Sequence, residues 1–417
     1  MRVVVVGTVV SNGGDAAILD AQLDLLRRTW PEAEVALHDS DQRVARRLYP
    51  GLEVHESVVA GMSTPTGPGA GRRARLARRR VLLAARLGRR SPLLARLLLR
   101  RREAASVMSL VRADVVAHTG GTTLIEKYPL DPKLFELEVA SAGGAELVLL
   151  PQSLGPFSRP DVVPRLRSLV DRAALVLLRD DRSLAHLRDI GASVDRARVV
   201  PDIVFALGTE QSEERLRSEQ VSAEPAVAVS VRDCSMFLDG AAGQAAFEAA
   251  VAGLVVHLVR ERGARVTFVS TCQGTPEYWA DDSRVAASVG AQLPPDVTAS
   301  VRLDAQRYDH EGLVRVLAGH EVAVTTRMHA GIVALGAGTP VLPIAYEFKT
   351  REVMGQVGLG DHVQDVGEVT ADSLVQGFEA LLADLPARRP ELASAVSQRR
   401  RGALALDAPL RAVAPGR

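Results

Sequence analysis

The segment TTRMHAGIVALGAGTPVLPIAYEFK, residues 325–349, holds the densest set of side chains that could do chemistry. Arg327 and His329 stand two residues apart where an apolar strand pattern changes to a helical one, and Tyr346 and Lys349 follow the next strand pattern. An imidazole can transfer a proton near neutral pH, and arginine and lysine bind anions. The segment therefore predicts a site that holds an anionic substrate and moves a proton.

A glycine-rich elbow, SNGGD, joins the first strand pattern to the first helical one at residues 11–15. The free amide groups at a helix start suit an anion, although simple helix initiation explains the same pattern. The spacing is not GxGxxG, so a dinucleotide fingerprint is absent. We expect Asn12, Gly14 and Asp15 to act on the acceptor from the first domain's side of a cleft, with Asp15 either capping the helix or accepting a hydroxyl proton.

Polar residues also follow several other strand patterns. They are Gly120 and Gly121 in AHTGGTTL, Gln152 in LLPQSLGPFS, Arg179 and Asp180 in LLRDDRS, Arg232 in SVRD, and Gln273 in STCQGTPE. Because the carboxyl ends of parallel strands face ligands, these residues are candidates for binding, and Asp180 is a second candidate base. The structural alternative for Arg179 and Asp180 is an ion pair with a helix cap.

Short β-branched runs alternate with helical patterns along most of the chain, which predicts an α/β protein with parallel sheets. The expected strands are RVVVVG, EVALHD, DVVAHTG, LVLLPQ, LVLLRD and ARVVPD, then AVAVSVRD, RVTFVST, EVAVTTR and PVLPIAYE. They indicate two Rossmann-like domains, at residues 1–207 and 227–365, facing a cleft. Residues 208–226 are expected as a linker and 366–417 as C-terminal helices and a tail.

Residues 72–102 carry 13 arginines and no acidic residue. We expect an insertion of two helices divided at Pro92, with Arg72, Arg75, Arg79, Arg86 and Arg90 on one face and Leu76, Leu83 and Leu87 on another. A solvated or partly disordered insertion is one interpretation. Docking on anionic lipid or on a partner is the other.

Bulk composition excludes several classes of protein. The net charge of +1 argues against nucleic-acid binding through the overall field. Cys234 and Cys272 form no metal or disulfide spacing, which favours a reducing cytoplasm and predicts no obligatory metal. We expect neither a signal peptide nor a membrane-spanning helix, because no apolar stretch of about 18 residues is evident.

Taken in order, NGGD, the Gly-Gly turn, PQSLGPF, RDDRS, PDIVF and TRMHAGIVALGAGTPVLPIAYEFK resemble the polysaccharide pyruvyl transferase family. The resemblance extends from about residue 5 to about residue 360. It implies a fold like that of the two-domain GT-B glycosyltransferases. HTGGTT stands where a triple glycine is more usual, and the arginine-rich insertion is not part of the resemblance.

The resemblance implies transfer of the enolpyruvyl group of phosphoenolpyruvate to a saccharide, forming a pyruvate ketal and releasing phosphate. The family's Arg-x-His pair corresponds to Arg327 and His329, for donor binding and catalysis, and its basic residue after the first strand of the second domain to Arg232. Phosphoenolpyruvate is the co-substrate and no other cofactor is expected. We expect the protein in the cytoplasm, and at the inner face of the membrane if residues 72–102 bind lipid. The sequence does not decide whether the protein forms an oligomer.

Two other functions fit the same residues. A GT-B glycosyltransferase would bind a nucleotide sugar in the same architecture, because fold does not decide chemistry. A non-catalytic ligand-binding protein of this fold would not need Arg327, His329 and Lys349 together. The identity of the donor separates these alternatives.

Overall fold

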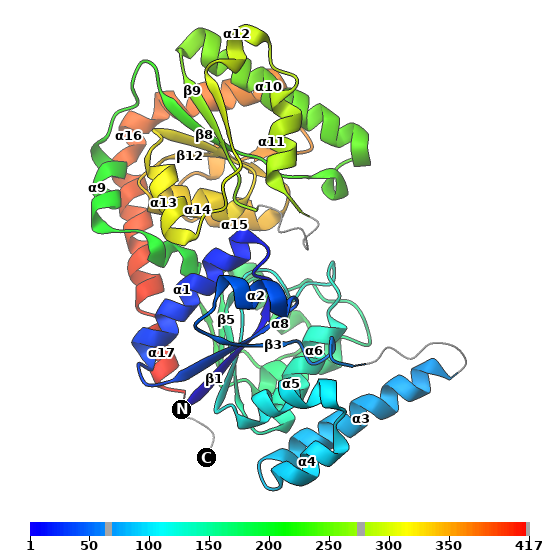
Figure 1. The fold of residues 1–417 in the computed structure, drawn as a ribbon. Coiled ribbons are helices and arrows are strands. Elements are labelled where there is room, and N and C mark those ends of the chain that lie inside the picture. Colours follow the sequence, from blue (N-terminus) through cyan, green and yellow to red (C-terminus); the bar gives the residue numbers. More distant parts are fainter. Residues whose placement is uncertain (63–68, 273–279, 414–417) are drawn as a thin grey trace. The chain divides into compact units, whose positions relative to one another are not determined.

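The computed structural model describes residues 1–62, 69–272 and 280–413 (Figure 1). These residues form two compact units. The first contains Met1–Val10, Ile18–Pro201 and the segment from Ala405 onward, and the second contains Ser11–Ala17 and Asp202–Leu404. Gln273, one of the expected binding residues, lies outside the described residues.

The first unit is built on a seven-stranded sheet in which every strand pairing is parallel. Its strands are β1 (Arg2–Thr8), β2 (Glu34–Asp39), β3 (Glu53–Glu56), β4 (Val115–His118), β5 (Glu146–Gln152), β6 (Leu175–Leu178) and β7 (Ala197–Val199), in the order β3-β2-β1-β4-β5-β6-β7. The run Val3–Val6 is buried because helices cover both faces of a parallel sheet.

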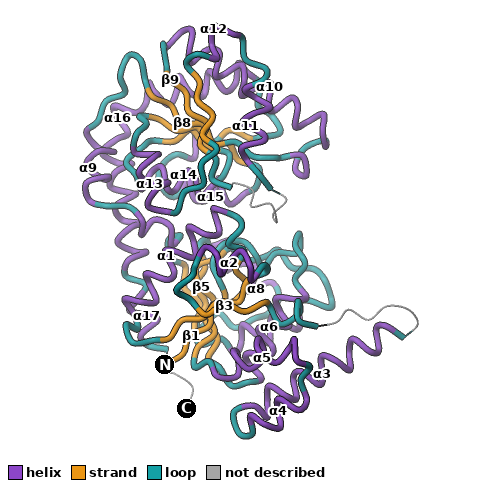
Figure 2. The backbone as a smooth tube through the Cα atoms, in the orientation of Figure 1, coloured by secondary structure: helices purple, strands orange, loops and turns teal. Residues whose placement is uncertain are grey.

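Helices flank the strands of this sheet (Figure 2). They are α1 (Gly13–Thr29), α2 (Gln42–Leu48), α3 (Ala70–Gly88), α4 (Pro92–Leu98), α5 (Arg101–Arg112), α6 (Asp131–Ala142), α7 (Val163–Arg172), α8 (Asp181–Asp189) and α17 (Asp407–Arg411). The arginine-rich insertion is helical as expected and supplies α3, α4 and the start of α5.

The second unit has a six-stranded sheet, also parallel, in the order β10-β9-β8-β11-β12-β13. Its strands are β8 (Ala226–Ser230), β9 (Arg265–Val269), β10 (Val301–Asp304), β11 (Val322–Thr325), β12 (Val341–Ala345) and β13 (Gln364–Asp365). Its helices are α9 (Glu210–Ser218), α10 (Gly240–Arg262), α11 (Asp282–Gly290), α12 (Pro295–Thr298), α13 (His310–Ala318), α14 (Met328–Gly336), α15 (Phe348–Gly355) and α16 (Ala371–Leu404), with 3₁₀ turns at Ile203–Leu207, Ser235–Phe237 and Gly360–His362. The α/β class with two parallel-sheet domains is confirmed.

The boundaries differ from the sequence-based ones. The expected linker contains α9, which packs on α16 through an ion pair between Glu213 and Arg400 (2.5 Å) and through buried Leu216. The C-terminal segment is divided, because α16 belongs to the second unit and α17 to the first. The sequence of α9 is polar apart from one buried leucine, Leu216, so its pattern did not indicate a packed helix.

Among the described helices, α10 is long and apolar enough to cross a membrane by length and composition, which the sequence analysis did not anticipate. A helix packed in a protein core passes the same test. Phe247, Val251, Leu254 and Leu258 of α10 are buried, so the helix contributes to the core of the second unit.

Candidate active site

The glycine-rich elbow, residues 11–15, leads into α1. The elbow and the first turn of α1 belong to the second unit. Asn12 accepts a hydrogen bond from the Gly14 amide through Oδ1 (3.0 Å), so Asn12 caps the helix. Asp15 lies half-buried in the first turn of the same helix.

The two glycines of the elbow allow close approach to other parts of the second unit. A Cβ on Gly13 would lie 1.8 Å from the Thr271 carbonyl oxygen, and one on Gly14 would lie 3.2 Å from Nδ1 of His329. Residues 11–17 thus group with the unit that holds His329, rather than facing it from the first domain. The elbow and the Arg-x-His segment form one local site.

His329 occupies the first turn of α14, directly after β11. Its Nε2 lies 3.6 Å from Oδ2 of Asp202, a buried carboxylate whose Oδ1 accepts a hydrogen bond from the Val204 amide. The imidazole thus has a carboxylate on one nitrogen and presents the other toward Gly14. A carboxylate at this distance can orient the ring.

Arg327, two residues earlier, is held by Asp282 at the start of α11. Its Nε and Nη2 donate to the two carboxylate oxygens, both at 2.6 Å. Burial opposes the charge on Arg327, but the carboxylate outweighs it and raises the pKa of the guanidinium above its usual value. Nη1 donates to no residue of the described chain, so this nitrogen of the guanidinium group can donate to a ligand.

Arg232 follows β8 and is held mainly by aromatic rings. Its guanidinium lies 4.4 Å from the ring centre of Tyr346 and 5.3 Å from that of Phe237, and its Nε donates to the Asp233 carbonyl (3.0 Å). The side chain is 8 % exposed, and within the described ranges no carboxylate pairs with it. Rings hold a cation in place without neutralising it.

Lys349, in the first turn of α15, is the third cation of this group. Its Nζ lies 2.8 Å from Oε2 of Glu347 and 5.6 Å from the Tyr346 ring centre. Tyr346 therefore lies beside both Lys349 and Arg232. Of the three cations, Arg232 is the one whose charge is not matched by a described acid.

Both cysteines are buried in this unit. Burial raises the pKa of the Cys234 thiol to about 12 and that of Cys272 to about 11, against the influence of Arg327. A neutral buried thiol is a poor nucleophile. Neither thiol is therefore a candidate nucleophile.

The first unit brings its predicted residues together in a different way. Arg179, at the end of β6, donates through Nη2 to the Gly121 carbonyl (2.8 Å) and to the Thr122 hydroxyl (2.8 Å). A Cβ on Gly120 would lie 2.4 Å from the Pro151 carbonyl oxygen, and Gln152 is fully buried. These contacts connect the carboxyl ends of β4, β5 and β6.

Asp180 serves as the N-cap of α8. Its Oδ1 accepts from the Ser183 amide (2.7 Å) and its Oδ2 from the Ser153 hydroxyl (2.6 Å). It is 2 % exposed, so both oxygens are used inside the fold and the expected role as a base is replaced by a structural one. The cap weighed for Asp180 is confirmed, whereas Arg179 bonds to a carbonyl and to hydroxyls.

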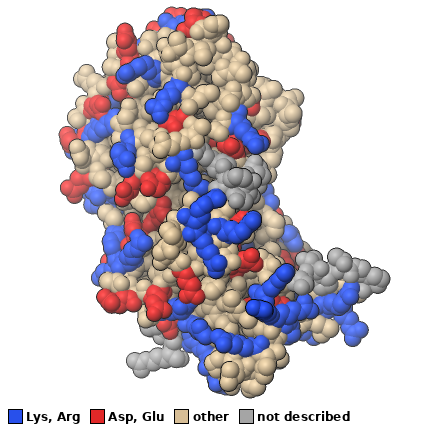
Figure 3. All heavy atoms as spheres, viewed as in Figure 1, with Lys and Arg blue, Asp and Glu red and all other residues tan. Residues whose placement is uncertain are grey.

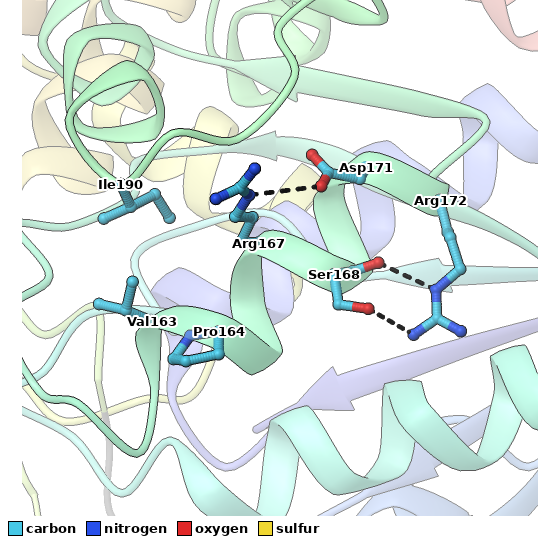
Figure 4. A pocket seen from close by; sticks show the side chains of 7 residues that line it. All are labelled: Val163, Pro164, Arg167, Ser168, Asp171, Arg172 and Ile190. Atoms are coloured by element: carbon cyan, nitrogen blue, oxygen red, sulfur yellow. Dashed lines mark hydrogen bonds and ion pairs between the residues drawn. The ribbon is translucent and has the colours of Figure 1, made fainter.

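The first unit also has a hollow of about 480 Å³ beside α7 (Figure 4). The charged side chains that line it bond to neighbours on the same helix: Arg167 pairs with Asp171 (3.7 Å), and Arg172 donates to Ser168 (2.9 Å). None of the predicted site residues lines this hollow. In the part of the chain that is described, no three potential metal ligands lie together.

Sequence reasoning missed the carboxylates that pair with the predicted basic residues. Asp282 pairs with Arg327, Asp202 lies beside His329, and Glu347 pairs with Lys349. Asp202 belongs to the PDIVF motif, which was a usable signal. Asp282 begins a helix 45 residues before Arg327, and nothing in its local pattern indicates that partner.

Comparison with known proteins agrees with this arrangement. A family model described as polysaccharide pyruvyl transferase matches residues 12–347, from the elbow to the residue beside Tyr346. The amylovoran biosynthesis protein AmsJ of Erwinia amylovora is 27 % identical over 299 residues, which cover 70 % of this chain and 71 % of AmsJ.

Two solved structures show the same fold. HepE of Anabaena, in complex with UDP-glucose, superposes with a TM-score of 0.55 at 13 % identity, over 99 % of this chain and 98 % of HepE. UDP-GlcNAc 2-epimerase of Neisseria meningitidis gives 0.56 at 10 % identity, over 98 % and 99 % of the two chains. The expected GT-B-like architecture is thereby confirmed.

Proposed function

Because the chain belongs to the polysaccharide pyruvyl transferase family, we propose that it transfers the pyruvyl group of phosphoenolpyruvate to a saccharide, forming a ketal and releasing phosphate. The observation that carries this proposal is the group of cations at the strand ends of the second unit, above all Arg232, whose charge no described acid matches.

The charges of the donor fit these cations. Phosphoenolpyruvate has a phosphate and a carboxylate, and planar guanidinium groups bind both kinds of anion through paired hydrogen bonds. Arg232 supplies the uncompensated charge, and Nη1 of Arg327 supplies a donor fixed in direction by Asp282. Lys349 adds a third cation beside Tyr346.

The first chemical step adds one acceptor hydroxyl across the donor's double bond. The hydroxyl oxygen bonds to C2 while a proton is delivered to the methylene carbon C3, which becomes a methyl group. We assign the proton to His329, because the imidazole lies beside the elbow and Asp202 faces its other nitrogen. We assign the hydroxyl proton to Asp15, a carboxylate in the first turn of α1, next to Gly14 and therefore close to His329.

The second step closes the ketal. A neighbouring hydroxyl of the same acceptor attacks C2, the bond from C2 to the phosphate oxygen breaks, and inorganic phosphate leaves with the electron pair. Arg232 and Arg327 stabilise the charge that develops on the phosphate. Neutral His329 takes the proton of the attacking hydroxyl, and Asp15 gives the proton it accepted in the first step to the leaving phosphate, so both groups return to their starting states.

Donor identity tests this proposal. The full chain is incubated with phosphoenolpyruvate and a panel of saccharides that present neighbouring hydroxyl pairs, and phosphate release is measured together with the mass gain of each saccharide. We expect phosphate release that depends on the acceptor and that falls about 10²- to 10³-fold in Arg232→Gln. Release of nucleoside diphosphate from a sugar nucleotide, with no reaction of phosphoenolpyruvate, would identify a glycosyltransferase instead.

A further inference from the structure

The α3–α4 hairpin, residues 70–98, is anchored to the first unit by one face. Val81, Ala84, Ala85 and Gly88 recur at helical spacing and are buried. A Cβ on Gly88 would lie 2.6 Å from Cγ1 of Val111 in α5, so the two helices are in close contact. The hairpin is a packed part of the unit, and its opposite face is turned to solvent.

Three of its arginines fasten the hairpin to the unit. Arg78 donates through Nη1 to Asp131 (2.7 Å), and Arg80 donates to the buried carboxylate of Glu103 (2.6 Å). Arg89 donates to the Ala113 carbonyl (2.9 Å). These three arginines therefore have a structural role, which is to hold the hairpin on the first unit.

Of the remaining arginines of residues 72–102, Arg73 and Arg100 also have interactions within the chain. Eight arginines of the segment are exposed and have no hydrogen bond or ion pair with any part of the chain that is described: Arg72, Arg75, Arg79, Arg86, Arg90, Arg96, Arg101 and Arg102. Figure 3 shows basic side chains gathered over this hairpin. The segment offers no acid of its own to neutralise them.

Leucines interrupt the arginines on the same solvent face. Along α3 the exposed residues Arg72, Leu76, Arg79, Leu83 and Arg86 follow one another at steps of three or four. The expectation that arginines and leucines occupy separate faces is wrong, because Val81, Ala84 and Ala85 form the buried face and leave Leu76 and Leu83 outside. Long arginine stems and leucines thus form one mixed surface.

The short helix α4 is still more apolar on its outer side. Leu93 is 76 % exposed and Leu97 is 82 % exposed, the two largest values among large apolar side chains of the described chain. Leu94 is exposed beside them, while Ala95 and Leu99 face inward. Among the described residues, five of the nine exposed large hydrophobic side chains lie on this hairpin.

We propose that the outer face of the α3–α4 hairpin docks on a lipid bilayer that carries anionic headgroups. The unpaired arginines complement the negative surface, and Leu93, Leu94 and Leu97 can enter the boundary between headgroups and acyl chains. A polyanion such as a nucleic acid would be bound by the arginines and would give the exposed leucines no partner. Because the surface combines unpaired arginines with exposed leucines, it fits a lipid bilayer better than a polyanion.

Vesicle binding tests the proposal with the full chain. Sedimentation is measured with phosphatidylcholine vesicles that contain or lack phosphatidylglycerol. We expect binding only to the anionic vesicles, a decrease at high salt, and a partition coefficient of order 100-fold lower in the triple variant Arg72→Gln, Arg79→Gln, Arg86→Gln. The matched control replaces three exposed arginines elsewhere, Arg188, Arg198 and Arg315, by Gln and should bind like the parent.

A second pair of variants isolates the apolar contribution. Leu97→Ser should weaken vesicle binding about 10-fold, whereas Leu303→Ser, at an exposed site of the second unit, should not. Leu97 is too exposed for its replacement to unfold the helix, and circular dichroism checks this. Absence of vesicle binding by the parent, or binding that neither hairpin variant weakens, would overturn the proposal. So would equal binding of the parent and Leu97→Ser, because the surface would then recognise anions alone.

Discussion

Arg179 and Arg232 follow strands of the two sheets, yet their surroundings differ. Arg179 is 1 % exposed and donates to a backbone carbonyl and two hydroxyls of neighbouring strand ends. Arg232 is held by two aromatic rings and one carbonyl, with no described carboxylate beside it. An arginine whose acceptors come from its own chain stabilises the fold. One that the chain positions without neutralising is available to a ligand.

The largest effect should come from the acid of the second unit. His329→Ala should lower turnover about 10²- to 10⁴-fold and leave the unfolding midpoint nearly unchanged, because a positioned acid contributes that much. Steady-state phosphate release checks it. His55→Ala is the control, since His55 contacts Glu53 at the edge of the first sheet. Turnover retained in His329→Ala would remove the ring from the mechanism.

Exchanging the two arginines for glutamine separates their roles. Arg232→Gln should reduce kcat/KM for phosphoenolpyruvate about 10²- to 10³-fold with little change in stability. Arg179→Gln should instead lower the free energy of unfolding by about 1–3 kcal/mol, because buried acceptors lose their partner. Urea unfolding and initial rates measured on both variants give the comparison. Equal losses of stability in the two variants would abolish the distinction.

The elbow provides the next contrast. Gly13→Ala should destabilise the second unit by about 1–3 kcal/mol, because the added methyl group would overlap the Thr271 carbonyl. Gly71→Ala, on α3 where nothing lies near the added methyl, should stabilise the helix by up to about 1 kcal/mol. Thermal unfolding of both variants checks these signs. A neutral Gly13→Ala would mean that the elbow is not packed against Thr271.

The last prediction concerns the pH dependence of the first unit's stability. Burial, with a contribution from Lys133, lowers the pKa of His118 to about 3. The folded protein therefore keeps His118 neutral while the unfolded chain takes up a proton near its usual pKa of 6.5. Stability should fall as the pH decreases from about 6.5 toward 3, by at most about 1.4 kcal/mol per pH unit. Urea midpoints across this range should fall less steeply in His118→Asn, and identical slopes would contradict the assignment.

The sequence predicted the inner strands of both sheets and missed three edge strands. Buried strands such as β1 and β11 read as continuous apolar runs. The missed strands are β3 (EVHE), β10 (VRLD) and β13 (QD), each at an edge of its sheet, where one side is open to solvent and polar residues are tolerated. Their patterns carry no periodic signal.

The site shows a similar division. Arg327, His329, Tyr346 and Lys349 were found because they follow strands directly. The sequence did not indicate the carboxylates that face them, because Asp282 and Asp202 are brought to these residues only by tertiary contacts. For the same reason, spacing alone could not tell that Asn12 and Asp180 are helix caps.

Calorimetric titration of phosphoenolpyruvate into the full chain tests the central claim most directly. The parent and the control Arg188→Gln should bind the donor equally, and Arg232→Gln should bind it at least about 10-fold more weakly, because a charged hydrogen-bond partner is lost. Unchanged affinity in Arg232→Gln would contradict the claim that the uncompensated arginine of the second unit holds the donor.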